Sequence, residues 1–350
     1  MPRAFEIKNV APGAAAVCLG PAGKGALEVR QSPRHEPASG EVEVAVEAAS
    51  VNPIDVRRSD GYGRRVFSLL GAARFPLVLG NDVAGTITAA GSRASPLRIG
   101  DRIYGVKPPS ARGTHASHVL VKADHVQRAP AGHALQNLAT LPYSFITMWL
   151  AVRGAGLTRQ NASGRRVLVH GAAGGLGTLA LQMLSIWGAT TTAIARTSGF
   201  EACRQGGAVS VVDAASQPFS DLGHSFDATL NFASWDDDLA LIGCLKEGAL
   251  GHATTVHPML GSLDEDGWIK GGWKLLGEKR RHRAALPHGT KNYAWVAFRP
   301  NKQALSDLGE LVERNVLNLP IGLRAPLVRA GEAFDHVRRR RGGRAVILPN

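Results

Sequence analysis

The sequence predicts an α/β protein of two domains, a doubly wound parallel sheet joined to a smaller, β-rich domain. Three observations lead to this prediction. From Arg165 onward, short β-branched segments alternate with helical stretches, which is the pattern of βαβ units around a parallel sheet. Before Leu138, short runs of strand character are instead punctuated by Gly and Pro. The length of 350 residues also exceeds the size at which one hydrophobic core usually stops growing.

The β-rich part comes first in the chain and ends at a helical segment. Alternating or β-branched residues predict strands at residues 41–46, 83–89 and 117–121. Residues 138–151 then change to helical character, and we expect this segment to lead into the second domain. The tail, residues 325–349, contains a short helix and a strand at 344–348, and we expect it to return to the first domain.

The parallel sheet is expected from the alternating segments that follow. The strand candidates are residues 166–170, 191–195, 210–212, 228–231 and 252–256. Helices are expected at residues 177–187 and 303–314, where apolar residues recur on one face. A long connection, residues 259–292, is expected to be functional or partly helical, and it precedes a last apolar run at 293–298. The predicted domains are residues 1–134 with 320–350, and residues 135–319.

The chain carries a strong positive charge. Its 41 Lys and Arg residues against 28 Asp and Glu residues give a net charge of +13, partly concentrated at residues 279–283 and 338–341. Such a balance is typical of proteins that bind nucleic acid or another polyanion. Aromatic residues do not interleave with these clusters, and the sequence has neither a zinc knuckle nor helix-turn-helix spacing. We therefore expect a basic face that attracts an anionic cofactor, and no nucleic-acid partner.

Cysteine content and hydropathy exclude several classes of protein. Cys18, Cys203 and Cys244 are odd in number and widely spaced, which argues against a disulfide framework and against a Cys-rich zinc lobe. The sequence has no apolar stretch approaching the ~20 residues that span a bilayer. Residues 1–10 lack the apolar core of a signal peptide. We expect a cytoplasmic protein without a membrane span.

The sharpest motif is a glycine-rich loop at residues 170–177, which reads His-Gly-Ala-Ala-Gly-Gly-Leu-Gly between a predicted strand and a predicted helix. Small residues let the backbone approach a pyrophosphate, and the helix N-terminus offers free N–H groups. Ala172 replaces the first Gly of the G-x-G-x-x-G fingerprint. We predict a Rossmann dinucleotide site here, the alternative being a plain tight turn. The expected phosphate contacts are Ala173, Gly174, Gly175, Leu176 and Gly177.

The residues after the second strand of this domain indicate which dinucleotide binds. NAD-binding Rossmann domains carry an Asp or Glu about 20 residues after the loop, and this acid accepts hydrogen bonds from the ribose hydroxyls. Arg196 stands here instead, followed by Thr197 and Ser198. Because a guanidinium pairs bidentately with a 2′-phosphate, we predict NADPH as the cofactor. The alternative for Arg196 is a solvent-exposed strand end.

Together with the phosphate loop, four further segments resemble the medium-chain dehydrogenase/reductase superfamily over essentially the whole chain. They are residues 50–55 (Ser-Val-Asn-Pro-Ile-Asp), 59–63 (Ser-Asp-Gly-Tyr-Gly), 75–85 and 141–149. Within the superfamily, the chain is similar to the zinc-independent quinone oxidoreductase branch, and especially to the mitochondrial reticulon-interacting oxidoreductases and their bacterial relatives. The resemblance implies a GroES-like fold for the β-rich domain, and a homodimer formed through the strand at residues 293–298.

The residues at the zinc-ligand positions of the superfamily predict an enzyme without metal. Zinc alcohol dehydrogenases carry Gly-His-Glu where this chain has Gly80, Asn81 and Asp82. The Cys ligand expected near Asn52 and Pro53 is absent, so a His/Cys/carboxylate tetrahedral site cannot be assembled. Without a Lewis acid, the substrate must accept hydride readily, as quinones and α,β-unsaturated carbonyls do. We therefore predict an NADPH-dependent quinone or enone oxidoreductase that acts on small molecules.

The resemblance also implies roles for individual residues. Asn52 would lie beside the nicotinamide ribose and the substrate, and Thr147 beside the nicotinamide. Tyr62 is the first candidate for binding the substrate carbonyl or donating a proton, with packing as its alternative, and Tyr143 is the second. Asp55 is expected to fix its loop through turn hydrogen bonds. Further cofactor contacts are expected from Asn231, Val256 and Arg344.

Two departures from the family leave alternatives open. Related reductases carry a Lys after the second strand and a Tyr after the third, near the adenosine phosphate, where this chain has Glu201 and the pair Asp213-Ala214. Arg196 or Arg204 would have to compensate.

A stand-alone enoyl reductase acting on acyl or polyketide intermediates fits the same fold, as does a non-catalytic, NADPH-sensing scaffold. Turnover with a panel of acceptors distinguishes the reductases from the sensor.

Overall fold

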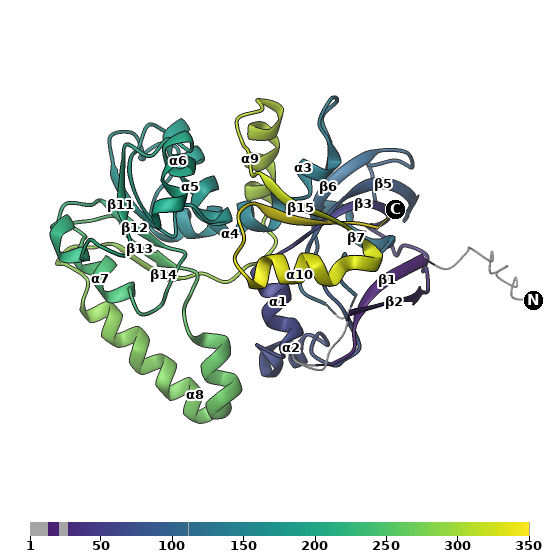
Figure 1. Cartoon of the computed structure of the whole chain (residues 1–350), viewed down its shortest axis with the longest axis horizontal. Coiled ribbons are helices and arrows are strands. Elements are labelled where there is room, and N and C mark those ends of the chain that lie inside the picture. Colours follow the sequence, from purple (N-terminus) through teal and green to yellow (C-terminus); the bar gives the residue numbers. More distant parts are fainter. Residues whose placement is uncertain (1–12, 21–26, 111, 350) are drawn as a thin grey trace, which may run out of the picture.

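The structure, a computed structural model, describes residues 13–20, 27–110 and 112–349. Two units lie side by side in it, each built around a large sheet (Figure 1). Residues 1–10, the segment predicted to lack a signal peptide, lie outside the described residues. In the described part of the chain, no helix combines the length and the apolar character needed to cross a membrane.

The β-rich unit contains a sheet in the order β15-β16-β3-β5-β6-β8, with β7 also paired to β3, and a smaller sheet in the order β2-β1-β4. The strands of the large sheet are β3 (Glu41–Val51), β5 (Asp82–Ala90), β6 (Arg102–Val106), β7 (His118–Lys122), β8 (Val126–Arg128), β15 (Ile321–Pro326) and β16 (Arg344–Leu348). Those of the small sheet are β1 (Gly13–Cys18), β2 (Leu27–Ser32) and β4 (Leu77–Val78). Val42, Val44 and Val46 alternate along β3 and are fully buried, which explains the strand pattern in the sequence.

The C-terminal tail returns to the β-rich unit, as predicted. β16 pairs antiparallel with β3, with Val346 opposite Ser50, and parallel with β15. Helix α10 (Ala330–Arg338) packs on both strands of the tail. This return places Arg344, the first residue of β16, beside residues that lie almost 300 positions earlier in the chain.

The second unit is a six-stranded, all-parallel sheet in the order β11-β10-β9-β12-β13-β14, which is the doubly wound order of Rossmann domains. Its strands are β9 (Arg166–His170), β10 (Thr190–Ala195), β11 (Ser210–Asp213), β12 (Ala228–Asn231), β13 (Gly251–Thr254) and β14 (Asn292–Trp295). The predicted parallel sheet is therefore confirmed. β13 ends two residues before the predicted position, because the N–H of Val256 turns to the side-chain hydroxyl of Thr254 and leaves the ladder.

Helices cover this sheet and connect the two units. They are α1 (Pro53–Ser59), α2 (Arg64–Leu69), α3 (Leu135–Leu138), α4 (Pro142–Gly154), α5 (Gly175–Ile186), α6 (Phe200–Gln205), α7 (Asp238–Gly243), α8 (Met259–Ala284) and α9 (Lys302–Glu313), with single turns η1 (Ala123–His125), η2 (Thr197–Gly199), η3 (Phe219–Leu222) and η4 (Leu327–Arg329). The helical stretch expected at residues 138–151 is two helices, because Pro142 lacks an N–H and begins α4. The long connection is α8, which is interrupted at Gly267.

Helix α4 lies between the units (Figure 1) and packs on α5, α9, β13 and β14, and also on β6 of the β-rich unit. Helix α3 lies against β3, β5 and β6. Buried side chains from both units therefore form one continuous core cluster, which includes Tyr104, Phe145 and Leu179. The division of the chain at residues 134/135 and 319/320 stays a prediction.

Candidate functional site

The glycine-rich loop follows β9 and opens α5, as predicted. Gly171 has a φ of 76°, a left-handed conformation that favours glycine. A Cβ atom on Gly177 would lie 2.3 Å from the carbonyl oxygen of Gly171 and 2.5 Å from Cα of Ala172. Only glycine therefore lets the first turn of α5 lie this close to the loop.

The start of α5 offers free backbone donors. Gly174 is the N-cap, and its carbonyl oxygen accepts the N–H of Thr178 at 2.8 Å. The N–H groups of Gly175, Leu176 and Gly177, in the first turn, precede that bond and have no intrahelical acceptor. Together with the positive end of the helix dipole, they can bind an anion such as a phosphate.

Arg196, Thr197 and Ser198 lie next to this loop. They follow β10 directly, and a Cβ on Gly199 would lie only 2.4 Å from Cβ of Ala173. All three side chains are exposed. The guanidinium of Arg196 forms no hydrogen bond or ion pair with another described residue, so it is free to bind a ligand at the loop.

Asp82, at the start of β5, is the centre of a buried polar cluster. Its Oδ2 accepts hydrogen bonds from Ser50 Oγ at 2.5 Å and from Asn52 Nδ2 at 2.8 Å, and its Oδ1 accepts the backbone N–H of Tyr143 at 2.6 Å. The guanidinium of Arg344 lies 3.9 Å from the carboxylate. It donates to Asn52 Oδ1 at 2.6 Å and to Ser50 Oγ at 3.1 Å. The cluster thus joins β3, β5 and β16 to the first turn of α4.

Burial governs the electrostatics of this cluster. It raises the pKa of Asp82, although the charge of Arg344 and the hydrogen bonds from Asn52 and Ser50 oppose the shift. Burial likewise lowers the pKa of Arg344, against the attraction of Asp82. Each charge is therefore stabilised mainly by the other, and both hold Asn52 in one orientation.

Two side chains that carry unpartnered donors, Arg344 and Ser144, adjoin the phosphate loop. A Cβ on Gly175 would lie 3.3 Å from Arg344 Nη1 and 3.8 Å from Ser144 Oγ. Arg344 Nε and Ser144 Oγ are both buried, and neither has a hydrogen-bond partner among the described residues. Because buried polar groups are nearly always hydrogen-bonded, these atoms and the free N–H groups of α5 fit a polar, anionic ligand such as a dinucleotide.

Tyr143 and Thr147 follow this cluster on α4. The ring of Tyr143 stacks on Phe298, with centroids 4.4 Å apart. Burial raises the pKa of Tyr143, and Asp55 and Asp82 raise it further, so its phenol is neutral and a hydrogen-bond donor at physiological pH. Thr147 Oγ1 donates to the carbonyl oxygen of Tyr143 at 2.7 Å, which fixes its rotamer along the helix.

The structure does not bring Tyr62 to the Asp82 cluster through any contact between described residues. The guanidinium of Arg57 lies 3.4 Å from the centre of its ring, and Gly261 of α8 lies on another side. In the structure, the ring of Tyr62 thus packs between Arg57 and Gly261, which is the alternative given for it above. Its role as a proton donor stays a prediction.

Asn231 and Val256 lie at the carboxyl ends of β12 and β13, the edge at which open α/β sheets bind ligands. The amide of Asn231 is fully buried and already donates to Asp238 Oδ1 and to the carbonyl oxygen of Ser234, both at 2.7 Å. Its side chain therefore holds the loop after β12. The contacts of both residues with a cofactor stay predictions.

Sequence reasoning assigned no role to three residues of the cluster, Ser50, Asp82 and Ser144. The sequence could have pointed to Asp82 as a site residue, because it stands where the zinc enzymes carry the Glu of Gly-His-Glu. The expected role of Asp55 is confirmed. Its Oδ2 accepts the N–H of Asn52 at 2.8 Å, and its Oδ1 accepts the N–H of Gly80 at 3.0 Å.

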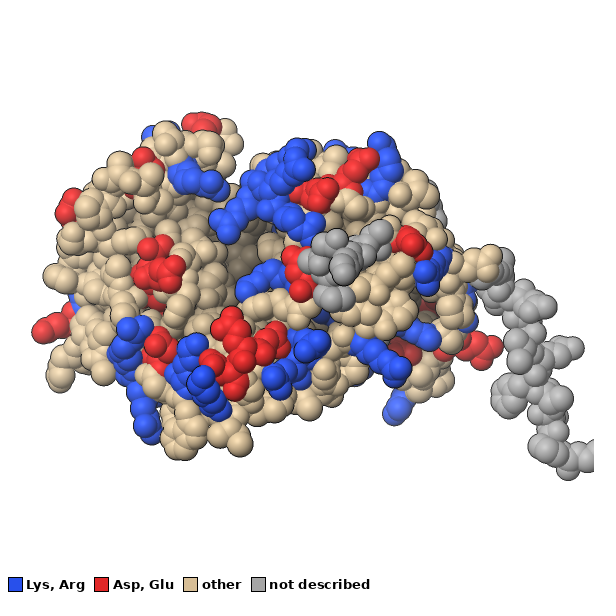
Figure 2. All heavy atoms as spheres, turned by 60° about the horizontal axis from the view of Figure 1, so that its bottom comes forward, with Lys and Arg blue, Asp and Glu red and all other residues tan. Residues whose placement is uncertain are grey.

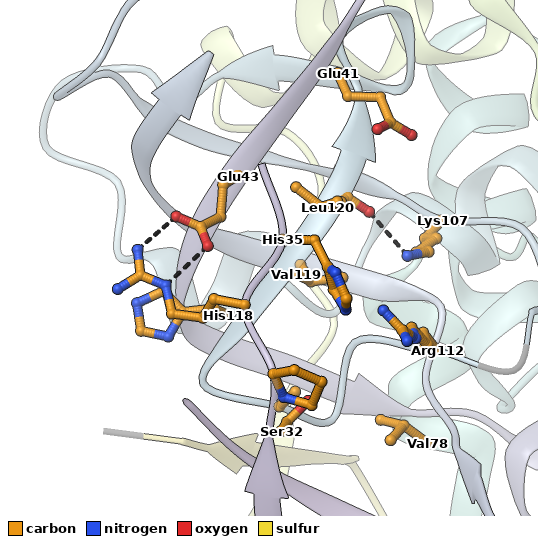
Figure 3. A pocket seen from close by; sticks show the side chains of 14 residues that line it. Ser32, His35, Glu41, Glu43, Val78, Lys107, Arg112, His118, Val119 and Leu120 are labelled. Atoms are coloured by element: carbon orange, nitrogen blue, oxygen red, sulfur yellow. Dashed lines mark hydrogen bonds and ion pairs between the residues drawn. The ribbon is translucent and has the colours of Figure 1, made fainter. Parts of the chain in front are cut away.

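A separate cavity of about 190 Å³ lies in the β-rich unit, and no predicted site residue lines it (Figure 3). Lys107, Arg112 and His35 line it together with the paired groups of Arg34 and Glu43. Lys107 Nζ donates to the carbonyl oxygen of Leu120 at 2.8 Å, and burial lowers the pKa of this amine to about 8. We do not include this cavity in the candidate site.

Comparison with known sequences gives matches over most of the chain. A family described as "Alcohol dehydrogenase GroES-like domain" matches residues 38–131. The chain is 33% identical over 319 residues to the "NAD(P)H oxidoreductase RTN4IP1, mitochondrial" of Homo sapiens, which covers 85% of this chain and 79% of that protein. It is 31% identical over 216 residues to the "2-methylene-furan-3-one reductase" of Solanum lycopersicum, covering 59% of this chain and 53% of that protein.

Solved structures share the fold. The quinone oxidoreductase from Coxiella burnetii matches with a TM-score of 0.77 at 23% identity, over 97% of this chain and 100% of that chain. The CurK enoyl reductase matches with a TM-score of 0.77 at 22% identity, over 95% of this chain and 98% of that chain. With the matched GroES-like domain, these likenesses confirm the predicted fold, a doubly wound parallel sheet beside a GroES-like, β-rich domain.

Proposed function

Since this chain belongs to the medium-chain dehydrogenase/reductase superfamily and is an oxidoreductase of that type, we propose that it is a zinc-independent, NADPH-dependent reductase of quinones or α,β-unsaturated carbonyls. The observation that carries the proposal is the junction at Gly175. There, the unpartnered donors Arg344 Nε and Ser144 Oγ and the open end of α5 adjoin the Asn52–Asp82 cluster. A phosphate-binding end and a polar cluster for a nicotinamide are thus continuous.

A nicotinamide cofactor is supported by the names of the relatives, which are NAD(P)H oxidoreductases. The preference for NADPH rests on Arg196, which follows β10 in the segment that reaches the phosphate loop at Gly199 and whose exposed guanidinium can pair with a 2′-phosphate. Thr197 and Ser198 add hydroxyl donors to the same place. Asp213 lies on β11 opposite Ala195. Its carboxylate already accepts the N–H of Ala215 and the hydroxyl of Ser216, which weakens its repulsion of a phosphate bound at Arg196.

The residues of the cluster have distinct tasks in this proposal. A bound NADPH would supply the hydride. Asn52, held by Asp82 and Arg344, orients the groups bound beside it, and the neutral phenol of Tyr143 donates a hydrogen bond to the acceptor carbonyl. Phe298, stacked on Tyr143, excludes water from that side.

Independence from zinc is supported by how the residues at the ligand positions are used. Both oxygens of Asp82 accept hydrogen bonds within the cluster. The amide of Asn81 donates to the carbonyl oxygen of Lys107 at 2.8 Å, and Pro53 offers no side-chain donor atom for a metal. A quinone or an enone needs no Lewis acid to accept hydride, which agrees with this arrangement.

The test is a fluorescence titration with NADPH and with NADH, followed by turnover with 1,4-benzoquinone and a simple enone. We expect tighter binding of NADPH, and we expect Arg196→Asp to weaken NADPH binding at least ~10-fold while changing NADH binding little. Arg98→Asp, an exposed arginine in the other unit, is the matched control and should leave both affinities unchanged. Equal effects of Arg196→Asp on both nucleotides would contradict the phosphate assignment. Binding of NADPH without turnover of any acceptor would instead favour the sensor.

The homodimer and the cytoplasmic location stay predictions. β14 is the end strand of the parallel sheet, so one of its edges is not paired within the described chain, which supports a dimer through this strand. Sedimentation velocity tests the homodimer, and a monomer at micromolar concentration would contradict it.

A further inference from the structure

Helix α8 carries an apolar surface that no other described element covers. Gly267, with a φ of 78°, divides the helix into two arms, and Figure 1 shows both arms at the lower edge of the molecule, outside the two large sheets. On the second arm, Gly271, Leu275 and His282 are buried against the protein. The opposite side of this arm therefore faces solvent.

That outward side is apolar where surface helices are normally polar. Ile269, Trp273 and Leu276 follow one another at spacings of four and three residues, so they share one face. Their exposed fractions are 79%, 69% and 40%, and Trp268, beside the break, is 48% exposed. A cluster of large exposed apolar side chains on one helix marks an interaction site.

Positive charge flanks this apolar face. Residues 268–284 contain six Lys and Arg residues, of which Lys270 and Lys274 both pair with Asp266, just before this range. Glu278 pairs with Arg281, whereas Arg280 and Arg283 form no ion pair with any described residue. Figure 2, with the lower edge turned forward, shows Lys and Arg side chains along this edge, separated by a few acidic ones. The surface is thus complementary to a negatively charged partner.

The first arm of α8 connects this surface to the β-rich unit. The carboxylate of Asp264 accepts the N–H of Gly63 at 2.5 Å and that of Arg65 at 2.9 Å. The ring of Tyr62 lies against Gly261 in the same contact. Helix α2 packs on α8 here, and the end of α2 exposes Leu69 and Leu70 by 74% and 62%. The first arm of α8 therefore contacts the β-rich unit beside the exposed Leu69 and Leu70.

We propose that the outward face of α8 docks on an anionic lipid surface, and that the substrate is a lipophilic quinone taken from that lipid; the second statement rests on the proposed function. Tryptophan and aliphatic side chains enter the boundary between headgroups and acyl chains, while flanking Lys and Arg bind anionic headgroups. A second copy on this face would bring Arg280 and Arg283, which form no ion pair with a described residue, against the same basic face. Base stacking by a nucleic acid would not account for Ile269 and Leu276.

Co-sedimentation with vesicles tests the docking. Full-length protein is mixed with phosphatidylcholine vesicles, either pure or containing about one-third phosphatidylglycerol. We expect at least ~10-fold stronger binding to the anionic vesicles, and a loss of at least ~10-fold in the double variant I269S/W273S. The double variant I99S/V328S, which removes two residues that are 68% and 76% exposed elsewhere, is the matched control and should bind like the unmodified protein.

Turnover measurements with a soluble and a lipid-dissolved quinone test the docking and the proposed reaction separately. We expect I269S/W273S to reduce water-soluble 1,4-benzoquinone at the unmodified rate, and to lose at least ~5-fold with a decyl-substituted benzoquinone dissolved in anionic vesicles. If no variant reduces either quinone while vesicle binding behaves as expected, the proposed function fails and the docking stands. Three results overturn the docking: no binding to anionic vesicles, equal binding by I269S/W273S, or conversion of a dimer to a monomer by I269S/W273S without vesicle binding.

Discussion

At the scale of single residues, the site depends on the mutual support of Asp82 and Arg344. The side chain of Arg344 is 11% exposed and that of Asp82 is fully buried, so neither charge is stabilised by bulk water. Asp82→Asn should lower the free energy of unfolding by about 3 kcal/mol, because it leaves a buried guanidinium without its counter-charge. Urea unfolding at pH 7 measures this loss.

The double variant D82N/R344M provides the control for this pair. It removes both charges, so its loss should be smaller than the sum of the losses of the two single variants, with a coupling energy of about 1–3 kcal/mol. Strictly additive losses would mean that the two groups do not stabilise each other, and that Asn52 is oriented in another way.

Lys107 gives a prediction with a defined pH window. Its folded pKa of about 8 lies below the ordinary 10.5, so between these values the unfolded chain binds more protons than the folded one. The free energy of unfolding should therefore rise with pH from about 8 to 10.5, relative to Lys107→Met, by about 1–3 kcal/mol. Below pH 8, the difference between the two proteins should be constant. If the free energies of unfolding of the two proteins differed by the same amount at every pH, the lowered pKa of Lys107 would be contradicted.

At the scale of elements, the close approach of α5 to the phosphate loop depends on Gly177. A Cβ there would lie 2.3 Å from a backbone oxygen, so Gly177→Ala must displace the helix. We expect a loss of stability of about 1–3 kcal/mol and at least ~10-fold weaker binding of NADPH, because the N–H groups of the first turn move.

Gly331→Ala in α10 is the matched control, since a Cβ there meets nothing within 4 Å and its φ is not positive. It should leave NADPH binding unchanged and should be neutral or stabilising by up to about 1 kcal/mol. Thermal unfolding and the nucleotide titration distinguish the two variants. Tight NADPH binding by Gly177→Ala would refute the loop as the phosphate site.

The elements also show what sequence reasoning can and cannot predict. The strands β9, β12 and β16 lie at the predicted residues, because local β-branched runs with clear ends specify them. The loop at residues 170–177 was predictable for the same reason, since its chemistry is contiguous. The cluster around Asp82 was not, because Arg344 reaches Asn52 across 292 residues and only the pairing of β16 with β3 brings them together.

Helix α8 illustrates a different limit. Ile269, Trp273 and Leu276 face outward, whereas the buried side of this arm includes Gly and His beside Leu275, so the usual inference of a core-facing apolar stripe fails. The sequence indicated only a functional or partly helical connection. When the apolar face of a helix serves a contact outside the chain, the spacing of its apolar residues does not predict which side of the helix packs on the core.

At the scale of the whole molecule, Asp264 links the two units through the backbone N–H groups of Gly63 and Arg65. Asp264→Ala should free these amides, so hydrogen exchange in residues 61–66 should accelerate at least ~10-fold. Exchange within β9 and β12, which lie inside the parallel sheet, should not change. Unchanged protection of residues 61–66 would mean that the units are held together by other contacts, such as those of α4.

We propose that the two units together position a nicotinamide for direct hydride transfer. The measurement that tests it most directly uses NADPH carrying deuterium at both C4 positions, with an α,β-unsaturated ketone as the acceptor, in ordinary water. We expect the saturated ketone to carry one deuterium at its β-carbon for each NADPH oxidised. A saturated ketone without deuterium, formed at the rate of NADPH oxidation, would contradict direct transfer in this site.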